Sequence, residues 1–235
     1  MLTRVCKLLL ALTGAGGLLL GAMVAAGSDV AVAATGGGEC QVTGNALFSP
    51  NGPGTTSNFA YSFLGNLTSC QSNVTGAPTS GTLEVGQVKT ESVTITTSTG
   101  TVQGTARYQE PLATGSGNIP ANSCPAGGTS GTGVTDWPDG STTVASFTTQ
   151  SAAAGVALQG SVIGNITLTL VPGSESPAGS APATFVINTT NPTFPVGDGV
   201  AGVLTFTTSN PTQCTTAAGL TSAAVQGTLG IGSPS

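Results

Sequence analysis

The sequence predicts an all-β protein: an antiparallel sandwich or barrel of roughly ten strands, preceded by a signal-peptide helix. Three observations predict it: short runs of alternating apolar residues, turn residues between these runs, and little charge. Charged residues make up 6% of the chain, against about 25% in an ordinary globular protein. Hydrophobic residues still make up 38%, so the chain can build a core and does not have the composition of a disordered segment.

Apolar side chains alternate with polar ones in several segments, as they do on strands that bury one face. The alternating sets are Phe59, Tyr61 and Phe63; Val93 and Ile95; Ile166, Leu168 and Leu170; Phe185 and Ile187; and Leu204 and Phe206. Strands with one apolar face must cover one another, which is why a sandwich or a barrel is expected.

Residues 134–144 give the clearest local signal, a β-hairpin. Trp137 ends the first strand, Pro138 suits the second position of a tight turn, and the following Asp-Gly pair tolerates left-handed backbone angles. We expect Asp136 and Asp139 to cap or shape this turn.

Three glycines recur in one short pattern, an apolar residue followed by Gln and Gly. They are Gly104, Gly160 and Gly227. A glycine among apolar strand residues indicates a bulge or a close approach of two backbones.

The first 34 residues have the pattern of a signal peptide. Arg4 and Lys7 give a positive start, residues 8–26 carry no charge, and an Ala-x-Ala cleavage pattern ends at Ala33. An uncleaved anchor is the alternative, because the apolar run is just long enough to span a bilayer. We expect cleavage, secretion and no membrane contact afterwards.

The mature chain, residues 35–235, is expected to form a single all-β domain, with a possible internal division near residues 111–131. It keeps two basic residues, Lys89 and Arg107, against eight acidic ones. Binding to nucleic acid needs a basic footprint, so nucleic acid is not expected as a partner, and neither is an anionic membrane surface.

The mature chain also contains four cysteines, and an even number in an exported protein predicts two disulfides. Three pairings are possible. We favour Cys40–Cys70, which would join neighbouring strands, and Cys124–Cys214, which would join the middle of the domain to its C-terminal hairpin. A zinc site is not expected, because the sequence has no His and no Cys-x-x-Cys pair. No cofactor is expected either.

Histidine-dependent catalysis is excluded because the chain contains no His. A carboxylate-dependent polysaccharide hydrolase is the enzymatic alternative, since glycoside hydrolysis needs only two acids at a set separation. We expect Glu110, at a strand exit before a proline, to be solvated, and we expect no enzyme. A structural calcium ion on aspartates in Gly-rich loops is a minor alternative. The candidate acids are Glu84, Glu91, Glu110, Asp136, Asp139 and Asp198, of which the three aspartates are the calcium candidates.

Aromatic residues offer a third kind of site. Trp137 and Tyr108 are candidates for stacking on a ligand such as a sugar, with packing inside the protein as the competing interpretation. Tyr61 is expected in the core because it alternates with two phenylalanines. The leading hypothesis is a secreted structural, adhesive or binding protein that associates with cell-envelope or polysaccharide material. A secreted inhibitor or ligand carrier is a further hypothesis, which predicts an apolar barrel interior or a protruding rigid loop at residues 171–182.

The layout resembles a group of secreted proteins of high-GC (actinobacterial-type) bacteria for which no activity is established. The matching features are the signal, a Cys-x-Val-x-Gly strand at Cys40, a second cysteine after an aromatic strand at Cys70, and a Trp-x-Asp-Gly-Ser hairpin at Trp137. The resemblance implies a β-sandwich that is loosely immunoglobulin-like, although the Cys-Trp-Cys spacing of true immunoglobulin domains is not matched.

Overall fold

The computed structural model describes residues 37–49, 58–115, 128–152, 155–209, 212 and 219–232. Residues 1–34 lie outside this part, so the signal peptide stays a prediction. No helix among the described residues is long and apolar enough to cross a bilayer. The described residues form thirteen strands: β1 (Gly38–Ser49), β2 (Phe59–Ser72), β3 (Gly81–Val85), β4 (Val88–Thr97), β5 (Gly100–Gln109), β6 (Ala113–Gly115), β7 (Thr129–Asp136), β8 (Thr142–Ala152), β9 (Gly155–Ile163), β10 (Asn165–Leu170), β11 (Thr184–Asn188), β12 (Gly199–Thr207) and β13 (Ser222–Gly232).

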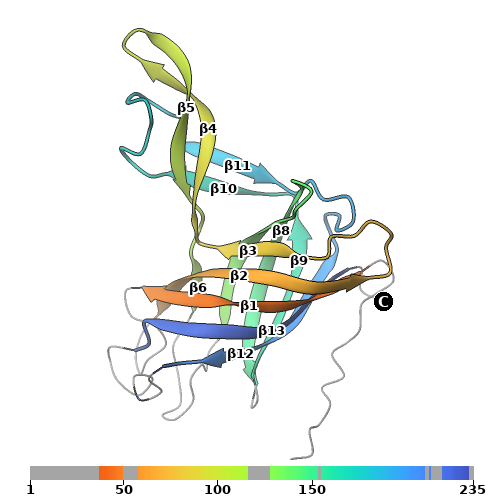
Figure 1. Cartoon of the computed structure of the whole chain (residues 1–235). Coiled ribbons are helices and arrows are strands. Elements are labelled where there is room, and N and C mark those ends of the chain that lie inside the picture. The colour runs from red at the N-terminus through yellow and green to blue at the C-terminus, as the bar shows by residue number, and fades with distance from the viewer. Residues whose placement is uncertain are drawn as a thin grey trace, which may run out of the picture.

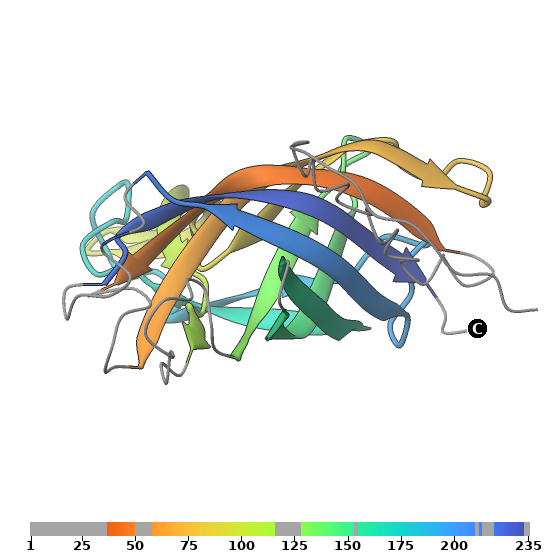
Figure 2. The same ribbon diagram turned by 90° about the horizontal axis from the view of Figure 1, so that it is seen from below.

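Eight of the strands close into an antiparallel barrel, in the order β1-β2-β3-β7-β8-β9-β12-β13 around the ring. Each strand pairs with the next barrel strand along the chain, which is the up-and-down arrangement. The ring closes where β13 pairs with β1, from Gly38 opposite Ile231 to Leu47 opposite Ser222. Figure 2 shows β1, β13 and β12 along one side and the strands from β7 to β9 along the other. Of the two predicted architectures, the barrel is the one found.

Two insertions into the barrel together make a second sheet. The first insertion supplies β4 and β5, the second supplies β10 and β11, and the strand order is β11-β10-β5-β4. The insertions meet where Leu170 of β10 pairs with Tyr108 of β5. Figure 1 shows this sheet beyond one side of the barrel, with the β4–β5 hairpin projecting farthest from it.

The short strand β6 pairs with both β2 and β7. Residues 116–127, which follow it, lie outside the described part. Because β6 pairs with β7, the strands before and after residues 116–127 belong to one sheet. The sequence suggested a possible division of the domain at this place, near residues 111–131.

Opposite faces of the barrel wall contribute to two separate cores. Thr135 of β7 and Thr143 of β8 face the barrel interior, whereas Val134 and Val144 pack under the second sheet. Alternation along each strand explains why adjacent residues enter different cores. Leu168, which belongs to the second core, is 0% exposed.

The three glycines of the repeated pattern lie where backbones approach closely. A Cβ atom at Gly160 would collide with the carbonyl oxygen of Ser146, and one at Gly227 with the carbonyl oxygen of Val203. Gly104 meets another backbone carbonyl in the same way. The predicted close approach is confirmed at all three positions.

Residues 171–182 do not form the predicted protruding loop, because they run along both edges of the β4–β5 hairpin. Ser176 exchanges backbone hydrogen bonds of 2.8 and 2.9 Å with Thr105 of β5, and Ser180 exchanges bonds of 2.8 and 2.9 Å with Thr96 of β4. The segment is thus hydrogen-bonded to both strands of the hairpin, and the part of the molecule that projects is the β4–β5 hairpin.

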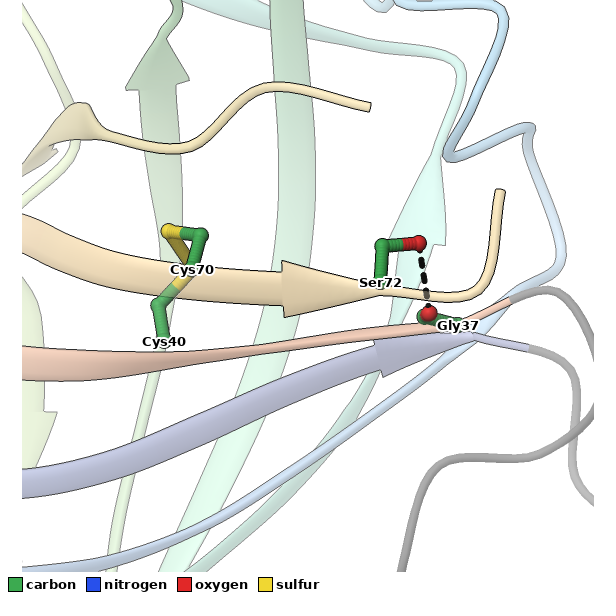
Figure 3. The surroundings of a disulfide bond; sticks show 4 residues. All are labelled: Gly37, Cys40, Cys70 and Ser72. Atoms are coloured by element: carbon green, nitrogen blue, oxygen red, sulfur yellow. Dashed lines mark hydrogen bonds between the residues drawn. A yellow bond between two sulfur atoms is a disulfide. The ribbon is translucent and has the colours of Figure 1, made fainter. Parts of the chain in front are cut away.

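A disulfide joins β1 to β2, as predicted for Cys40 and Cys70 (Figure 3). It lies beside a shift in the pairing register between the two strands. Nearby, the Ser72 hydroxyl donates a 2.8 Å hydrogen bond to the carbonyl of Gly37. Cys124 and Cys214 lie outside the described residues, so their pairing stays a prediction.

The hairpin between β7 and β8 has the predicted turn. The N–H of Gly140 donates to the carbonyl of Trp137 at 3.0 Å, and Gly140 has a left-handed φ of 81°. The Asp139 carboxylate accepts hydrogen bonds from the Ser141 N–H and hydroxyl, at 2.9 and 2.6 Å. These bonds lower the pKa of Asp139, and its predicted role in the turn is confirmed.

Candidate functional site

The barrel interior contains a cavity of about 100 Å³. Eight-stranded barrels are just wide enough for side chains to fill them or for one small ligand to be held. Here small residues line part of the wall, among them Ala46, Gly133 and Ala145. They leave the lumen incompletely filled, which makes it the candidate functional site.

One end of the barrel is closed by a pair of aromatic rings. Trp137 follows β7, Phe194 precedes β12, and their ring centroids are 5.3 Å apart. The indole N–H of Trp137 donates to the Thr143 hydroxyl at 2.9 Å. The Asn191 side-chain oxygen accepts the Phe194 backbone N–H at 3.2 Å. Both rings are buried, so they form a fixed floor.

The opposite end of the cavity is lined by a second aromatic group. Phe48 ends β1, Phe59 and Tyr61 begin β2, and the ring of Phe48 lies 5.7 and 5.9 Å from the other two. Phe147 and Phe206 also line the cavity. Four of these five rings are only partly buried, whereas both rings of the floor are buried.

Three hydroxyl groups meet at the aromatic end. The Tyr61 hydroxyl lies 3.0 Å from the Thr129 hydroxyl, which lies 2.7 Å from the Thr149 hydroxyl. The Thr129 backbone N–H also donates to the Thr149 hydroxyl oxygen at 3.1 Å. Burial raises the pKa of Tyr61 to about 12, with the bond to Thr129 opposing it. Tyr61 is therefore a neutral phenol at any ordinary pH.

No charged side chain in the described ranges lines the cavity, and the candidate acids lie elsewhere. Lys89 of β4 forms ion pairs of 2.8 Å with Glu84 of β3 and 2.5 Å with Asp136 of β7. Although burial opposes it, these two carboxylates hold the pKa of Lys89 above its usual value. Asp136 therefore joins the second sheet to the barrel wall, and the expectation that it shapes the turn is wrong.

Glu110 is buried, not solvated as the sequence suggested, with 1% of its surface exposed. The N–H of Gln87, in the crossing from β3 to β4, donates to one carboxylate oxygen at 3.0 Å. The other oxygen has no partner among the described residues. Burial raises the pKa of Glu110 to about 7; the Gln87 N–H and Lys89 lower it, whereas Glu84 adds to the increase.

The remaining acids do not assemble into a metal site. Within the described ranges, no three Asp, Glu, Cys or His side chains are grouped to hold a metal ion. Asp198 is buried just before the start of β12. Burial raises the pKa of Glu91, and the Lys89 charge opposes that increase.

The two aromatic candidates for ligand stacking are both buried. Trp137 belongs to the barrel floor, with 4% of its surface exposed. Tyr108 is 0% exposed, packs at 5.4 Å on Phe185 and donates its hydroxyl to the Pro182 carbonyl at 3.0 Å. Neither ring offers a free face, so packing is the role that the structure gives them.

Sequence reasoning did not select Thr129 or Thr149. A signal for the second is present: Thr143, Ala145, Phe147 and Thr149 alternate along β8 and all line the cavity. Because two of these four residues are polar, the set does not read as an apolar face. Comparisons with protein-family models, curated proteins and solved structures found no match.

Proposed function

We propose that this is an exported, non-enzymatic binding protein whose barrel holds one small apolar ligand. The observation that carries the proposal is the cavity of about 100 Å³, lined by hydrocarbon and hydroxyl groups. Ligand sites are typically concave and mostly apolar, with a few placed polar groups. A cavity of about 150 Å³ engineered into another protein binds benzene. A ring of about six non-hydrogen atoms, or the end of a longer chain, therefore suits this space.

The difference between the two barrel ends supports this function. Trp137 and Phe194 close the floor, whereas Phe48, Tyr61 and Phe206 line the other end and are partly exposed. Partly exposed aromatic rings around an apolar lumen provide contact area for a ligand at little entropic cost. Closure of the sheet holds the wall rigid, so the site is preformed.

Titration with benzene, followed by amide NMR shifts, tests the proposal. Saturable shifts should appear at lumen residues. Ala145→Leu places a larger side chain in the lumen and should abolish them, whereas Thr148→Leu adds the same side chain on the outer face of the same strand and should preserve them. Absence of saturable binding to the unmodified protein would refute the proposed function.

The Cys40–Cys70 disulfide suits an oxidising compartment outside the cytoplasm. Together with the charge pattern of residues 1–34, it supports export. Mass spectrometry of protein recovered from the culture medium should find a chain that begins at Ala34 or Thr35. A full-length chain retained in the cell would contradict this part of the proposal.

The positions of the acids do not favour polysaccharide hydrolysis. Glu84 and Asp136 share Lys89, Glu110 is buried, and Asp139 is engaged in a turn. None of the acids lines the cavity. We therefore expect no release of reducing sugars from polysaccharides by the purified protein.

A second candidate function is adhesion through the outer face of the second sheet. Thr90, Ser92, Thr94 and Thr96 alternate along β4 and are all exposed. Such a row of hydroxyl groups suits contact with neutral polysaccharide or envelope material. Replacing Ser92 and Thr94 by Glu should reduce retention on isolated envelope material; equal retention of both proteins would exclude this face.

A further inference from the structure

The polar groups of the lumen indicate which ligand chemistry it accepts. Besides hydrocarbon, the described side chains that line it carry five hydroxyl groups, those of Tyr61, Thr129, Thr135, Thr143 and Thr149. Burying a charged ligand group without a partner is very costly. A ligand held there is therefore neutral, and its polar contact is made to a hydroxyl.

The three hydroxyls at the aromatic end lie in a row beside a backbone group that can only donate. The Thr129 N–H donates to the Thr149 oxygen. The Thr149 and Thr129 hydroxyls lie 2.7 Å apart, the Thr129 and Tyr61 hydroxyls lie 3.0 Å apart, and in each pair either oxygen can be the donor. In the order from Thr149 to Thr129 to Tyr61, both threonine hydroxyls accept and donate, which is the mutually strengthening arrangement.

In this order the chain of hydrogen bonds ends on the Tyr61 hydroxyl, and no described residue accepts the hydrogen of that hydroxyl. We infer that Tyr61 donates a hydrogen bond to the carbonyl or ether oxygen of a neutral, otherwise apolar ligand. The ligand class is thus small ketones, aldehydes and esters, or longer molecules that present such a group. This inference rests on the proposed function and adds the chemistry of the ligand to it.

Two further features favour an acceptor oxygen on the ligand. The phenol keeps its proton at ordinary pH, because burial raises its pKa to about 12. The phenol also stands among the rings of Phe48 and Phe59, where an unmatched donor is costly. An oxygen that accepts this hydrogen removes the cost, and a hydrocarbon ligand does not.

The test compares two ligands of equal size, cyclopentanone and methylenecyclopentane, which differ only in the oxygen. Dissociation constants for both are measured by NMR titration of the full mature chain and of its Tyr61→Phe variant. The ratio of hydrocarbon to ketone dissociation constants should fall about tenfold in Tyr61→Phe, which corresponds to about 1.4 kcal/mol for one hydrogen bond. Tyr108→Phe is the matched control, because its hydroxyl is bonded to Pro182 outside the lumen; it should leave the ratio unchanged.

The outcomes separate the two proposals. If both ligands bind and the ratio is the same in Tyr61→Phe, the assigned ligand chemistry is wrong while the binding function stands. If neither ligand nor benzene binds the unmodified protein, the binding function itself fails. If Tyr108→Phe shifts the ratio as much as Tyr61→Phe, the effect does not arise at the lumen and the inference is overturned.

Discussion

The barrel interior and the core under the second sheet are both made by alternating strands, yet they differ in packing and in charge. The lumen keeps a cavity of about 100 Å³, and the described residues that line it carry no charge. The second core buries Ile95, Tyr108 and Leu168 completely. At the junction beside it lie Lys89, with its two acid partners, and Glu110.

The difference teaches that the charged groups and the free space lie in different places. The carboxylates and the lysine look like functional groups, but they join the inserted sheet to the barrel wall. These ion pairs are partly exposed, with 13% to 42% of each side chain accessible, so they add little stability. The region with few reactive groups is the one with free space, and free space is what a ligand needs.

The largest expected effect compares equivalent leucines in the two regions. Leu168 is 0% exposed in the second core, whereas Leu158 is 8% exposed and lines the cavity. Leu168→Ala should lower the free energy of unfolding by about 4 kcal/mol, within the range for buried leucines. Leu158→Ala should lower it by about 2 kcal/mol, because its side chain borders a void and makes fewer contacts. Urea unfolding measures both losses, and equal losses would show that the lumen is packed as tightly as the second core.

The disulfide should stabilise the barrel by a similar amount. It links cysteines 30 residues apart, and loop-closure entropy for that separation gives about 3.6 kcal/mol. The Cys40→Ser/Cys70→Ser double variant should unfold at a correspondingly lower urea concentration. Hydrogen exchange should accelerate first in β1 and β2, while β10 and β11 keep their protection. Acceleration that begins in β10 and β11 would show that the two regions are not independently stabilised.

The junction should make stability depend on pH in an unusual direction. The native pKa of Glu110 is about 7, above its ordinary value of 4.5, so the native state holds this proton more tightly than the unfolded state. The stabilising contribution is complete below about pH 4.5 and is lost as pH rises to about 7. Glu110→Gln mimics the protonated form, so its stability relative to the unmodified protein should rise by about 3 kcal/mol from pH 4 to pH 8.

At the β7–β8 turn, stability should depend on pH in the opposite direction, and this turn therefore provides the control. Hydrogen bonds lower the pKa of Asp139, so its contribution is present above its unfolded pKa and is lost as pH falls through its native pKa. Asp139→Asn should therefore lose stability relative to the unmodified protein as pH rises. Unfolding curves at several pH values measure the stability of both variants. A stability difference between Glu110→Gln and the unmodified protein that stays constant with pH would contradict the raised pKa of the buried Glu110.

Local patterns predicted the strand faces and the turn but not the two cores. Alternation correctly placed Phe63 and Leu168 on buried faces, although one belongs to the barrel and the other to the second core. Barrel closure depends on pairing between β1 and β13, at opposite ends of the described chain. The strand number exceeds ten because short strands such as β3 and β6 carry too few residues to show alternation.

The roles of single polar residues depended on distant partners. Glu110 looked solvated because it precedes a proline, but it is buried and accepts a hydrogen bond from the N–H of Gln87, 23 residues earlier. Tyr108 receives its partner from Pro182, 74 residues later. Contacts over such sequence separations leave no local pattern. The sequence could therefore identify these side chains as candidates but could not predict which residues contact them.

The smallest expected effect compares threonines on either side of the barrel wall. The Thr132 hydroxyl, on the Val134 side of β7, is buried and has no partner in the described ranges. The Thr143 hydroxyl, in the lumen, accepts the Trp137 indole N–H. Removing an unsatisfied hydroxyl relieves a desolvation cost, whereas removing an acceptor leaves a buried donor unpaired. Thr132→Val should therefore stabilise the protein by about 1 kcal/mol and Thr143→Val should destabilise it by about 1 kcal/mol or more, measured by thermal and urea unfolding. Loss of stability in both variants would mean that the Thr132 hydroxyl does have a hydrogen-bond partner. The lumen and the opposite face of the barrel wall would then not differ in whether their hydroxyl groups are hydrogen-bonded.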